Sequence, residues 1–395
     1  MKYELLAPAG AFPQLHAAIS AGADAVYLGL KELNMRATGK NFTFQELKKA
    51  SKICKQKNIR IYLTLNTIIY SSEIKKLEKL IKKISKQKLV DAIICWDLAV
   101  IKLCRKYKTP FHISTQASVS NTESANFYKK LGAKRIILAR ELNLKQIKEI
   151  SKIIPVECFC HGAMCVSISG RCFTSQFLQG KSANRGQCTH PCRRPYLITD
   201  LTDSTKQLKL QNNKVMSAKD LCTLPFIEKM KKAGITSFKI EGRNRAPEYV
   251  YTVTKIYKKA LNKKLTKKQI IQSIQELKKV YNRGFSSGFY IKTPTSDDFS
   301  FSENGEQTEK KVFIGKVQKY WPKAKVAHVK IMTGKLKPGN EIYIIGKNTG
   351  IKKTKIQSME INKKPVRQAK KPQDVGIKLP PCQKGDEIYL ISQKN

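Results

Sequence analysis

The sequence predicts an α/β protein, a closed (β/α)8 TIM-like barrel followed by a small antiparallel β-barrel domain. Through the first two-thirds of the 395 residues, eight short apolar runs alternate with amphipathic helical stretches. From residue 312 onward the pattern changes to short alternating strands separated by Gly, Pro and Asn turns. Eight strand-and-helix units favour a closed parallel barrel over an open sheet.

Each predicted barrel strand is a short apolar run, and we place the eight at residues 3–6, 25–28, 59–65, 92–95, 111–114, 135–138, 156–160 and 237–240. Apolar residues at helical spacing predict helices between them, for example at 12–21, 44–55, 72–86 and 144–153. Two more helices follow the last strand, at 246–261 and 267–281.

The predicted domain boundaries follow from these patterns. Residues 1–290 form the barrel, 291–311 a polar linker, and 312–395 the small domain. Its strands are expected at 313–320, 324–331, 339–346, 354–361 and 385–391. A long cysteine-rich insertion at 161–236 separates strands seven and eight, and it leaves the carboxyl end of strand seven, which is the active-site face of such barrels.

Four cysteines in this insertion have the spacing C-x6-C-x15-C-x3-C, and they are Cys165, Cys172, Cys188 and Cys192. Glycines, serines and an Asn-Arg-Gly turn between them allow four thiolates to converge on one centre, as an iron–sulfur cluster or a zinc ion requires. Spacing alone does not separate iron from zinc. Cys222 is an alternative fourth ligand.

Disulfides are the competing interpretation, and they depend on the compartment. The first residues, MKYELLAPAG, lack a charged segment followed by an apolar one, and no apolar run is long enough to span a membrane. We therefore expect a cytoplasmic protein without membrane association, in which clustered cysteines bind metal.

The composition is strongly basic, with 76 Lys and Arg against 29 Asp and Glu and a formal net charge of +47. A polyanion such as RNA is the expected partner, although lysine-rich solvated helix faces also explain much of the charge. The arginines of the cysteine region suit phosphate better than lysines do, and they are Arg171, Arg185, Arg193 and Arg194.

Polar residues in strand seven or just after the other strands are expected to face the pocket. Among them we expect acid–base or catalytic roles for Glu157, His161 and Arg243. Substrate-binding candidates are Asn66, Gln116, Arg140, Glu141 and Glu241, together with Arg171, Arg193 and Arg194. Structural roles stay open, since Glu241 and Arg243 can form an ion pair and Arg140 with Glu141 can begin a helix. No H-E-x-x-H, G-x-S-x-G or Walker motif is present.

The run ECFCHGAMCVSISGRCFTS at 157–175 resembles the signature of the U32 peptidase family. Further matches are LLAPAG, AVYLGL, ARELNLKQI, SAKDL, FKIEGRNR and NRGFSSGFY, so the resemblance covers essentially the whole chain. Thr174 departs from the aliphatic residue usual in the signature. The family name implies proteolysis, because some members were described as collagenases. Better-understood members are similar to oxygen-independent hydroxylases that carry a 4Fe-4S cluster on four cysteines.

The chain resembles most the group that hydroxylates the wobble uridine of tRNA in a prephenate-dependent way. This resemblance implies Cys165, Cys172, Cys188 and Cys192 as cluster ligands, tRNA as partner and prephenate as a small carboxylate cosubstrate. The alternatives are a collagenase-like U32 peptidase, a 23S rRNA cytidine hydroxylase of the same family, and a noncatalytic zinc-containing RNA-binding protein. The sequence does not predict an oligomeric state.

Overall fold

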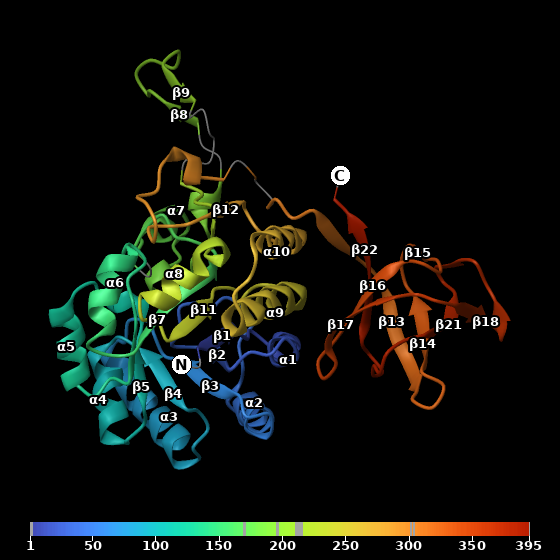
Figure 1. Ribbon diagram of the computed structural model, residues 1–395, viewed down its shortest axis with the longest axis horizontal. Coiled ribbons are helices and arrows are strands. Elements are labelled where there is room, and N and C mark those ends of the chain that lie inside the picture. Colours follow the sequence, from blue (N-terminus) through green and yellow to red (C-terminus); the bar gives the residue numbers. More distant parts are fainter. Residues whose placement is uncertain are drawn as a thin grey trace.

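The computed structural model describes residues 3–168, 171–194, 197–209, 216–300, 302 and 305–394. Parts of the predicted insertion and linker lie outside these residues. The first domain is a closed ring of eight parallel strands surrounded by helices (Figure 1), which confirms the predicted barrel. The ring contains β1 (Glu4–Pro8), β2 (Ala25–Gly29), β3 (Arg60–Thr64), β4 (Ala92–Cys95), β5 (Phe111–Ile113), β6 (Arg135–Ile137), β7 (Val156–Gly162) and β11 (Ser237–Ile240). Pairing of β11 with both β1 and β7 closes it.

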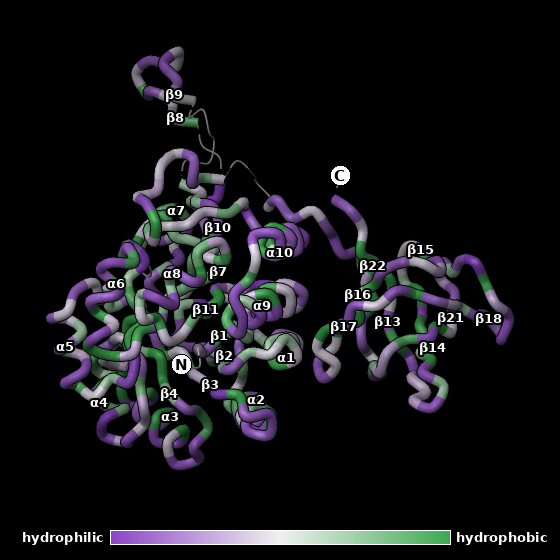
Figure 2. Tube along the Cα trace, viewed as in Figure 1, coloured by the Kyte–Doolittle hydropathy of each residue, from purple (hydrophilic) through white to green (hydrophobic). Residues whose placement is uncertain are grey.

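Helices cover the outside of the ring, and they are α1 (Phe12–Ser20), α2 (Phe44–Gln56), α3 (Ile74–Lys86), α4 (Leu98–Lys106), α5 (Thr122–Lys130), α6 (Leu144–Ser151), α8 (Ile227–Lys232), α9 (Pro247–Asn262) and α10 (Lys267–Lys279). Helix α3 shows why they pack there: Leu77, Ile81 and Ile84 form one buried stripe, while lysines occupy its outer face. Figure 2 shows the resulting contrast between hydrophobic strands inside and hydrophilic helix surfaces outside.

The segment between β7 and β11 contains α7 (Thr174–Gln179), the hairpin β8 (Leu197–Thr199) with β9 (Gln207–Lys209), and β10 (Asp220–Cys222). Strand β10 returns antiparallel to the end of β7, with Leu221 opposite Gly162, and β12 (Phe285–Ser286) pairs with β10. The pattern of single apolar runs did not reveal these two short strands. We call residues 163–219 the cysteine loop; it begins and ends at the mouth of the barrel.

The small domain is an antiparallel β-structure of ten strands in the described residues, namely β13 (Glu309–Trp321), β14 (Val326–Ile331), β15 (Lys335–Leu336), β16 (Glu341–Gly346), β17 (Gly350–Lys355), β18 (Met359–Ile361), β19 (Lys364–Pro365), β20 (Ala369–Lys370), β21 (Asp374–Lys378) and β22 (Glu387–Gln393). The strand expected at 354–361 is divided between β17 and β18, because the chain turns at 356–358. Strand β21 was not predicted.

The small domain lies beside α1 and α9 of the barrel (Figure 1). Ile345 and Ile351 join the hydrophobic core of the barrel domain. Gly350 has φ +70°, and a Cβ there would lie 2.7 Å from the Cβ of His16, so the close approach of β17 to α1 requires glycine. The two domains therefore share a packed interface. Within the described residues, no helix is long and apolar enough to cross a membrane.

Candidate active site

A small pocket of about 60 Å³ lies at the carboxyl ends of the barrel strands. Carboxyl ends of parallel strands meet at one face of a barrel, which is where binding sites form in this architecture. We call it the anion pocket, and it is lined by Tyr27, Met35, Arg36, Thr64, Asn66, Ser114, Thr115, Gln116, Arg140, Phe159, Cys165, Lys239, Glu241 and Arg243. Its volume admits a group the size of a carboxylate.

Arg243 is the most enclosed cation of the pocket, with 4% of its surface exposed. Its guanidinium donates to Thr64 Oγ1 at 2.9 Å and to Asn34 Oδ1 at 2.8 Å, both neutral oxygens. Burial lowers its pKa to about 10, so it stays charged at neutral pH. It forms no ion pair with a carboxylate of the described chain. A buried cation without a counterion favours an anionic ligand.

Glu241 pairs with Arg36 across the mouth, with an Nη2–Oε1 distance of 3.1 Å. Burial alone raises the pKa of Glu241, but Arg36, Arg140, Arg243 and Lys239 together lower it below the usual value. Glu241 is therefore ionised at neutral pH, and one carboxylate balances only part of the surrounding positive charge.

Arg140 and Lys239 complete the positive side of the pocket. Arg140 donates to the carbonyl of Ala163 at 2.8 Å and stacks over the Phe159 ring at 3.9 Å, and its buried Nε has no described partner. Lys239 Nζ lies 3.2 Å from Glu157 Oε1. Burial lowers the pKa of Lys239, and the Glu157 carboxylate opposes that shift.

Amide and hydroxyl groups form the opposite wall. Asn66 Nδ2 lies 3.4 Å from Gln116 Oε1 and 3.5 Å from Ser114 Oγ, and Trp96 donates to the Asn66 carbonyl at 3.0 Å. Since Asn66 and Gln116 hold each other in place, they present fixed polar groups to a ligand.

The cysteine loop covers this pocket and contributes Cys165 to its lining. Arg193 joins the two ends of the loop by donating to the carbonyls of Met164 and Ala218. Arg185 pairs with Glu73 at 2.6 Å, and Arg171 lies 3.4 Å from the Gln116 carbonyl. The structure thus uses Arg193 and Arg185 to hold the loop, whereas the Arg194 side chain is exposed and forms no ion pair with a described residue.

All eleven cysteines are free thiols. Burial raises the pKa of Cys192, and Cys165, Cys188 and Cys172 are close enough to raise it further. Cys188 also accepts from the backbone N–H of His190 at 3.4 Å. The four thiols are the donors that a cluster needs. In the described part of the chain, however, no three Cys, His, Asp or Glu side chains converge closely enough to hold a metal ion.

Cys222 lies apart from these four thiols. It is buried on β10, where the Tyr257 hydroxyl lies 3.7 Å from its Sγ, and burial raises its pKa to about 11. Cys160 is its buried neighbour on β7. The described geometry therefore places Cys222 behind the barrel wall, against α9, while Cys165 faces the pocket.

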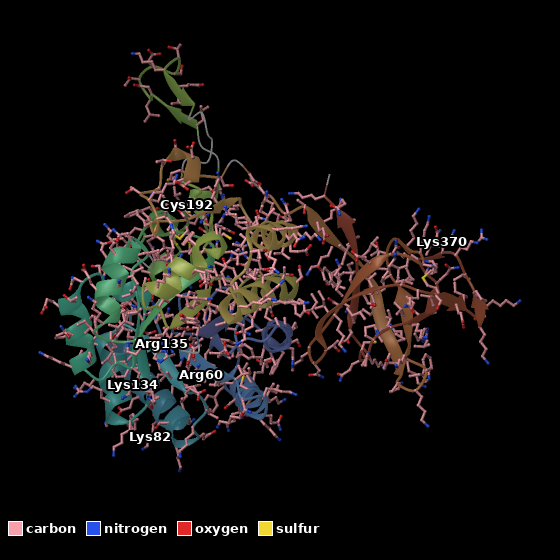
Figure 3. The ribbon with its side chains drawn as sticks, viewed as in Figure 1. Arg60, Lys82, Lys134, Arg135, Cys192 and Lys370 are labelled. Atoms are coloured by element: carbon pink, nitrogen blue, oxygen red, sulfur yellow. The ribbon has the colours of Figure 1, made fainter. Side chains whose placement is uncertain are left out.

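Three other predicted site residues lie outside the pocket lining. Glu157 is fully buried inside the barrel, where Arg135 and Lys239 pair with it at 3.2 Å each. His161 faces outward among Tyr249, Tyr257 and Phe285, and burial lowers its pKa to about 3. Glu141 is exposed. Figure 3 shows Arg135 and Arg60, which begin β6 and β3, and Cys192 near the opposite end of the barrel.

Arg36, Thr64 and Lys239 also line the pocket and were not predicted from the sequence. A signal for Lys239 existed, since Lys239, Glu241 and Arg243 alternate along β11 and the segment after it, and alternate residues of a strand face the same side. Arg36 lies in a loop without periodicity, and only the fold brings it to Glu241.

Two exposed aromatic rings stand on the cysteine loop. Phe173 and Phe177 are 62% and 84% exposed, and their ring centroids are 6.1 Å apart. Phe173 follows Cys172 directly in the chain, and Phe177 lies four residues further on. The loop therefore presents an apolar surface to solvent beside the cysteines.

The model of peptidase family U32 matches residues 10–299. The chain belongs to the U32 family. The predicted family is thereby confirmed, and the match extends over the barrel and the cysteine loop. The model of elongation factor Tu domain 2 matches residues 324–380, within the small domain.

Relatives of this U32 protein are named for two different activities, proteolysis and tRNA hydroxylation. An uncharacterised protease of Methanocaldococcus jannaschii is 41% identical, over 99% of this chain and 98% of its own. A collagenase of Porphyromonas gingivalis is 37% identical, with the same coverage. The tRNA hydroxylation protein P1 of Bacillus subtilis is 34% identical, over 81% of this chain and 78% of its own. Family membership leaves two reaction classes open.

Proposed function

We propose that this U32 protein is a tRNA hydroxylase that acts on the wobble uridine, uses prephenate and does not require oxygen. The observation that carries the proposal is the anion pocket: Arg243, Arg140 and Lys239 surround a space of carboxylate size, and Cys165 lies at its edge. A similar protein from Bacillus subtilis is named a tRNA hydroxylation protein.

In this proposal the chain's own groups bind and orient the reactants. Arg243 binds a carboxylate of prephenate, because it is buried and no described carboxylate pairs with it. Asn66 and Gln116 orient the ligand by hydrogen bonds. Glu241 holds Arg36 at the mouth, while Phe173 and Phe177 offer rings on which a flipped base can stack.

Cys165, Cys172, Cys188 and Cys192 would hold a 4Fe-4S cluster. Their chemistry fits, since four free thiols lie in one loop and none forms a disulfide. Closing of the loop is required to bring the four sulfur atoms together. When bound, the cluster supplies electron transfer.

The first test is anaerobic purification with iron and sulfide analysis, followed by mass spectrometry of tRNA nucleosides from a deletion strain. We expect about four irons and four sulfides per chain and loss of 5-hydroxyuridine-type nucleosides in the deletion strain. Cys172→Ala should lose both the brown colour and the modification. Modification that persists in the colourless variant would refute the cluster's role.

A U32 peptidase is the second candidate, favoured by the names of the 41% and 37% identical relatives. The pocket argues against it, because no histidine lines it among the described residues and His161 is buried facing α9. A cysteine nucleophile needs such a base. Gelatin cleavage that survives iron removal would favour the peptidase.

A further inference from the structure

A second, larger hollow lies between the barrel and the small domain. It measures about 640 Å³, and its barrel side comes from residues 11–14, 39–40 and 243–247. Its other side comes from Lys311, residues 345–347, Gly385, Glu387 and Tyr389 of the small domain. Arg243 borders both this hollow and the anion pocket, so the two spaces adjoin.

The lining of this hollow is mostly positive. Of its charged residues in the described chain, one is a carboxylate, Glu387, and the cations are Lys40, Arg243, Arg245, Lys311 and Lys347. We call it the basic groove. Lys40 and Arg245 have no carboxylate of the described chain within ion-pair distance. Lys347 lies 3.9 Å from Glu46, and Lys311 pairs with Glu248 at 2.9 Å. Positive charge without local balance attracts a polyanion.

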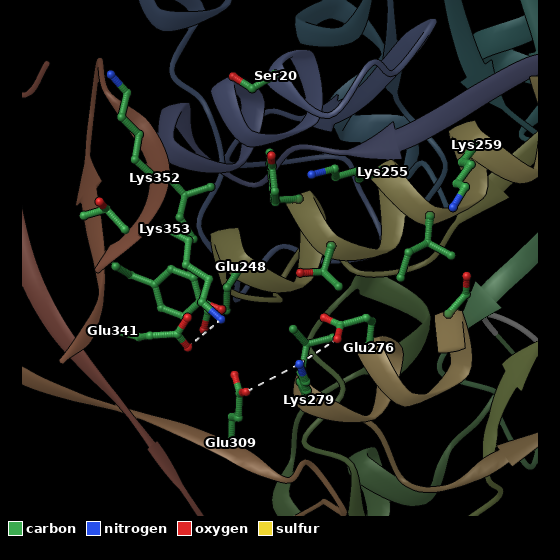
Figure 4. Close-up of a pocket in the computed structure, with 18 of the residues that line it drawn as sticks. Ser20, Glu248, Lys255, Lys259, Glu276, Lys279, Glu309, Glu341, Lys352 and Lys353 are labelled. Carbon is green, nitrogen blue, oxygen red and sulfur yellow. Dashed lines mark hydrogen bonds and ion pairs between the residues drawn. The ribbon is translucent and has the colours of Figure 1, made fainter. Parts of the chain in front are cut away.

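A neighbouring hollow of about 920 Å³ provides the contrast. Figure 4 shows it on the same interface, and its lining includes four carboxylates, Glu248, Glu276, Glu309 and Glu341. Ion pairs bind some of these carboxylates to lysines: Lys353 lies 3.0 Å from Glu341, and Lys279 lies 2.6 Å from Glu276. We call it the mixed-charge groove. Its lining has six lysines against four carboxylates, so it is less positive than the basic groove, which has five cations against one carboxylate.

The basic groove also offers flat polar and aromatic groups. The guanidinium of Arg245 stacks on the Tyr281 ring at 3.6 Å, which holds its plane in place. Exposed Asn244 and the Tyr389 side chain lie in the same lining. A cationic groove with such groups is typical of proteins that bind single-stranded nucleic acid.

The small domain has many more basic than acidic residues. From residue 312 onward the chain has 19 Lys and Arg against 5 Asp and Glu. Lys335 is directly opposite Lys370, and Lys316 is directly opposite Lys330, in antiparallel pairs. Like charges directly opposite destabilise a sheet. These four lysines do not line the basic groove, and Lys316 pairs with Glu387 at 3.5 Å, so they contribute to the positive field of the domain and not to the groove itself.

We propose that the basic groove binds the backbone of a single-stranded RNA segment and directs it to the anion pocket. This inference rests on the proposed tRNA substrate and adds the surface that receives it. The packed interface at Ile351 and Gly350 fixes the two sides of the groove relative to each other, so both domains contact the same RNA segment.

The test is RNA binding by the full-length protein without prephenate, so that binding is measured apart from reaction. Lys40→Gln with Lys347→Gln neutralises one exposed lysine on each side of the basic groove. The matched control, Lys255→Gln with Lys355→Gln, neutralises one exposed lysine from each domain in the mixed-charge groove. The probe is a fluorescent, unmodified anticodon stem-loop, titrated at several salt concentrations.

Each phosphate contact with a single strand contributes about 0.7 to the slope of log affinity against log salt. The groove variant should therefore bind about tenfold more weakly near 0.15 M salt, with a slope shallower by about 1.4. The control variant should bind like the unchanged protein.

Equal RNA affinity in the groove and control variants would overturn the inference and leave the proposed function standing. Absence of RNA binding by the unchanged protein at low salt would overturn both. Polyglutamate that binds as tightly as RNA, with the same dependence on Lys40 and Lys347, would overturn the assignment to RNA.

Discussion

Arg243→Met removes the buried cation of the anion pocket while keeping a side chain of similar length. Burial lowers the pKa of Arg243 from its usual value to about 10. Since one pKa unit corresponds to about 1.4 kcal/mol, the buried charge costs about 3 kcal/mol of folding free energy at neutral pH. Against this, Thr64 and Asn34 lose their donors, which costs about 1–3 kcal/mol. The two effects nearly cancel.

We therefore expect the free energy of unfolding of Arg243→Met to stay within about 2 kcal/mol of the unchanged protein. Affinity for prephenate should fall about 10- to 100-fold, because a charge-assisted bond to a carboxylate contributes about 1.5–3 kcal/mol. Urea unfolding and titration calorimetry measure the two quantities. Arg194→Met, at an exposed arginine, is the control and should change neither.

A large loss of stability with unchanged prephenate affinity would refute this reasoning. It would show that Arg243 supports the fold through Thr64 and Asn34 and that the anion binds elsewhere. Loss of affinity with stability preserved is the result that a binding role requires.

Three further predictions follow from the placement of other residues. Glu157→Gln should lower the free energy of unfolding by about 3 kcal/mol in urea, because buried Lys239 loses its carboxylate partner and Arg135 keeps only Glu4; an unchanged stability would contradict the interior network. For His161, the folded pKa of about 3 lies below the unfolded value, so stability is lost as pH falls from about 6.5 toward 3. His161→Phe should remove about 2–3 kcal/mol of the loss between pH 6.5 and 4.5, and identical pH profiles would contradict it. Phe177→Ala should leave the melting temperature unchanged and weaken anticodon stem-loop binding about tenfold; full affinity in the variant would exclude base stacking there.

The barrel could be predicted because each of its strands is a short apolar run, buried on both sides and bounded by turns. Five residues predicted at the polar ends of strands lie together in the lining of the anion pocket, namely Asn66, Gln116, Arg140, Glu241 and Arg243, and their roles stay predictions. Glu157 and His161 are four residues apart on β7, so strict alternation would turn both toward the same side. The pairing of β7 with β11 shifts register between Phe159 and His161, and beyond this irregularity His161 points toward α9, whereas Glu157 points into the barrel. A run buried on both faces does not reveal such an irregularity.

The remaining features depend on contacts between distant segments. Strand β10 has only three residues and exists because β7 extends far enough to pair with it. Arg36 pairs with Glu241, which lies 205 residues further along the sequence. The basic groove needs two domains, and neither domain's sequence pattern contains it. Composition predicted the positive charge, but only the packed interface decides where that charge is concentrated.

The pairing of β10 with β7 has a consequence for how this architecture can vary. Because the cysteine loop leaves the barrel at Gly162 and returns opposite it at Leu221, its two ends are fixed beside each other. Insertions or deletions inside the loop then leave the register of every barrel strand intact. The loop can therefore differ between related chains while the barrel continues to fold in the same way. Changes in this one segment can then give related chains new substrates.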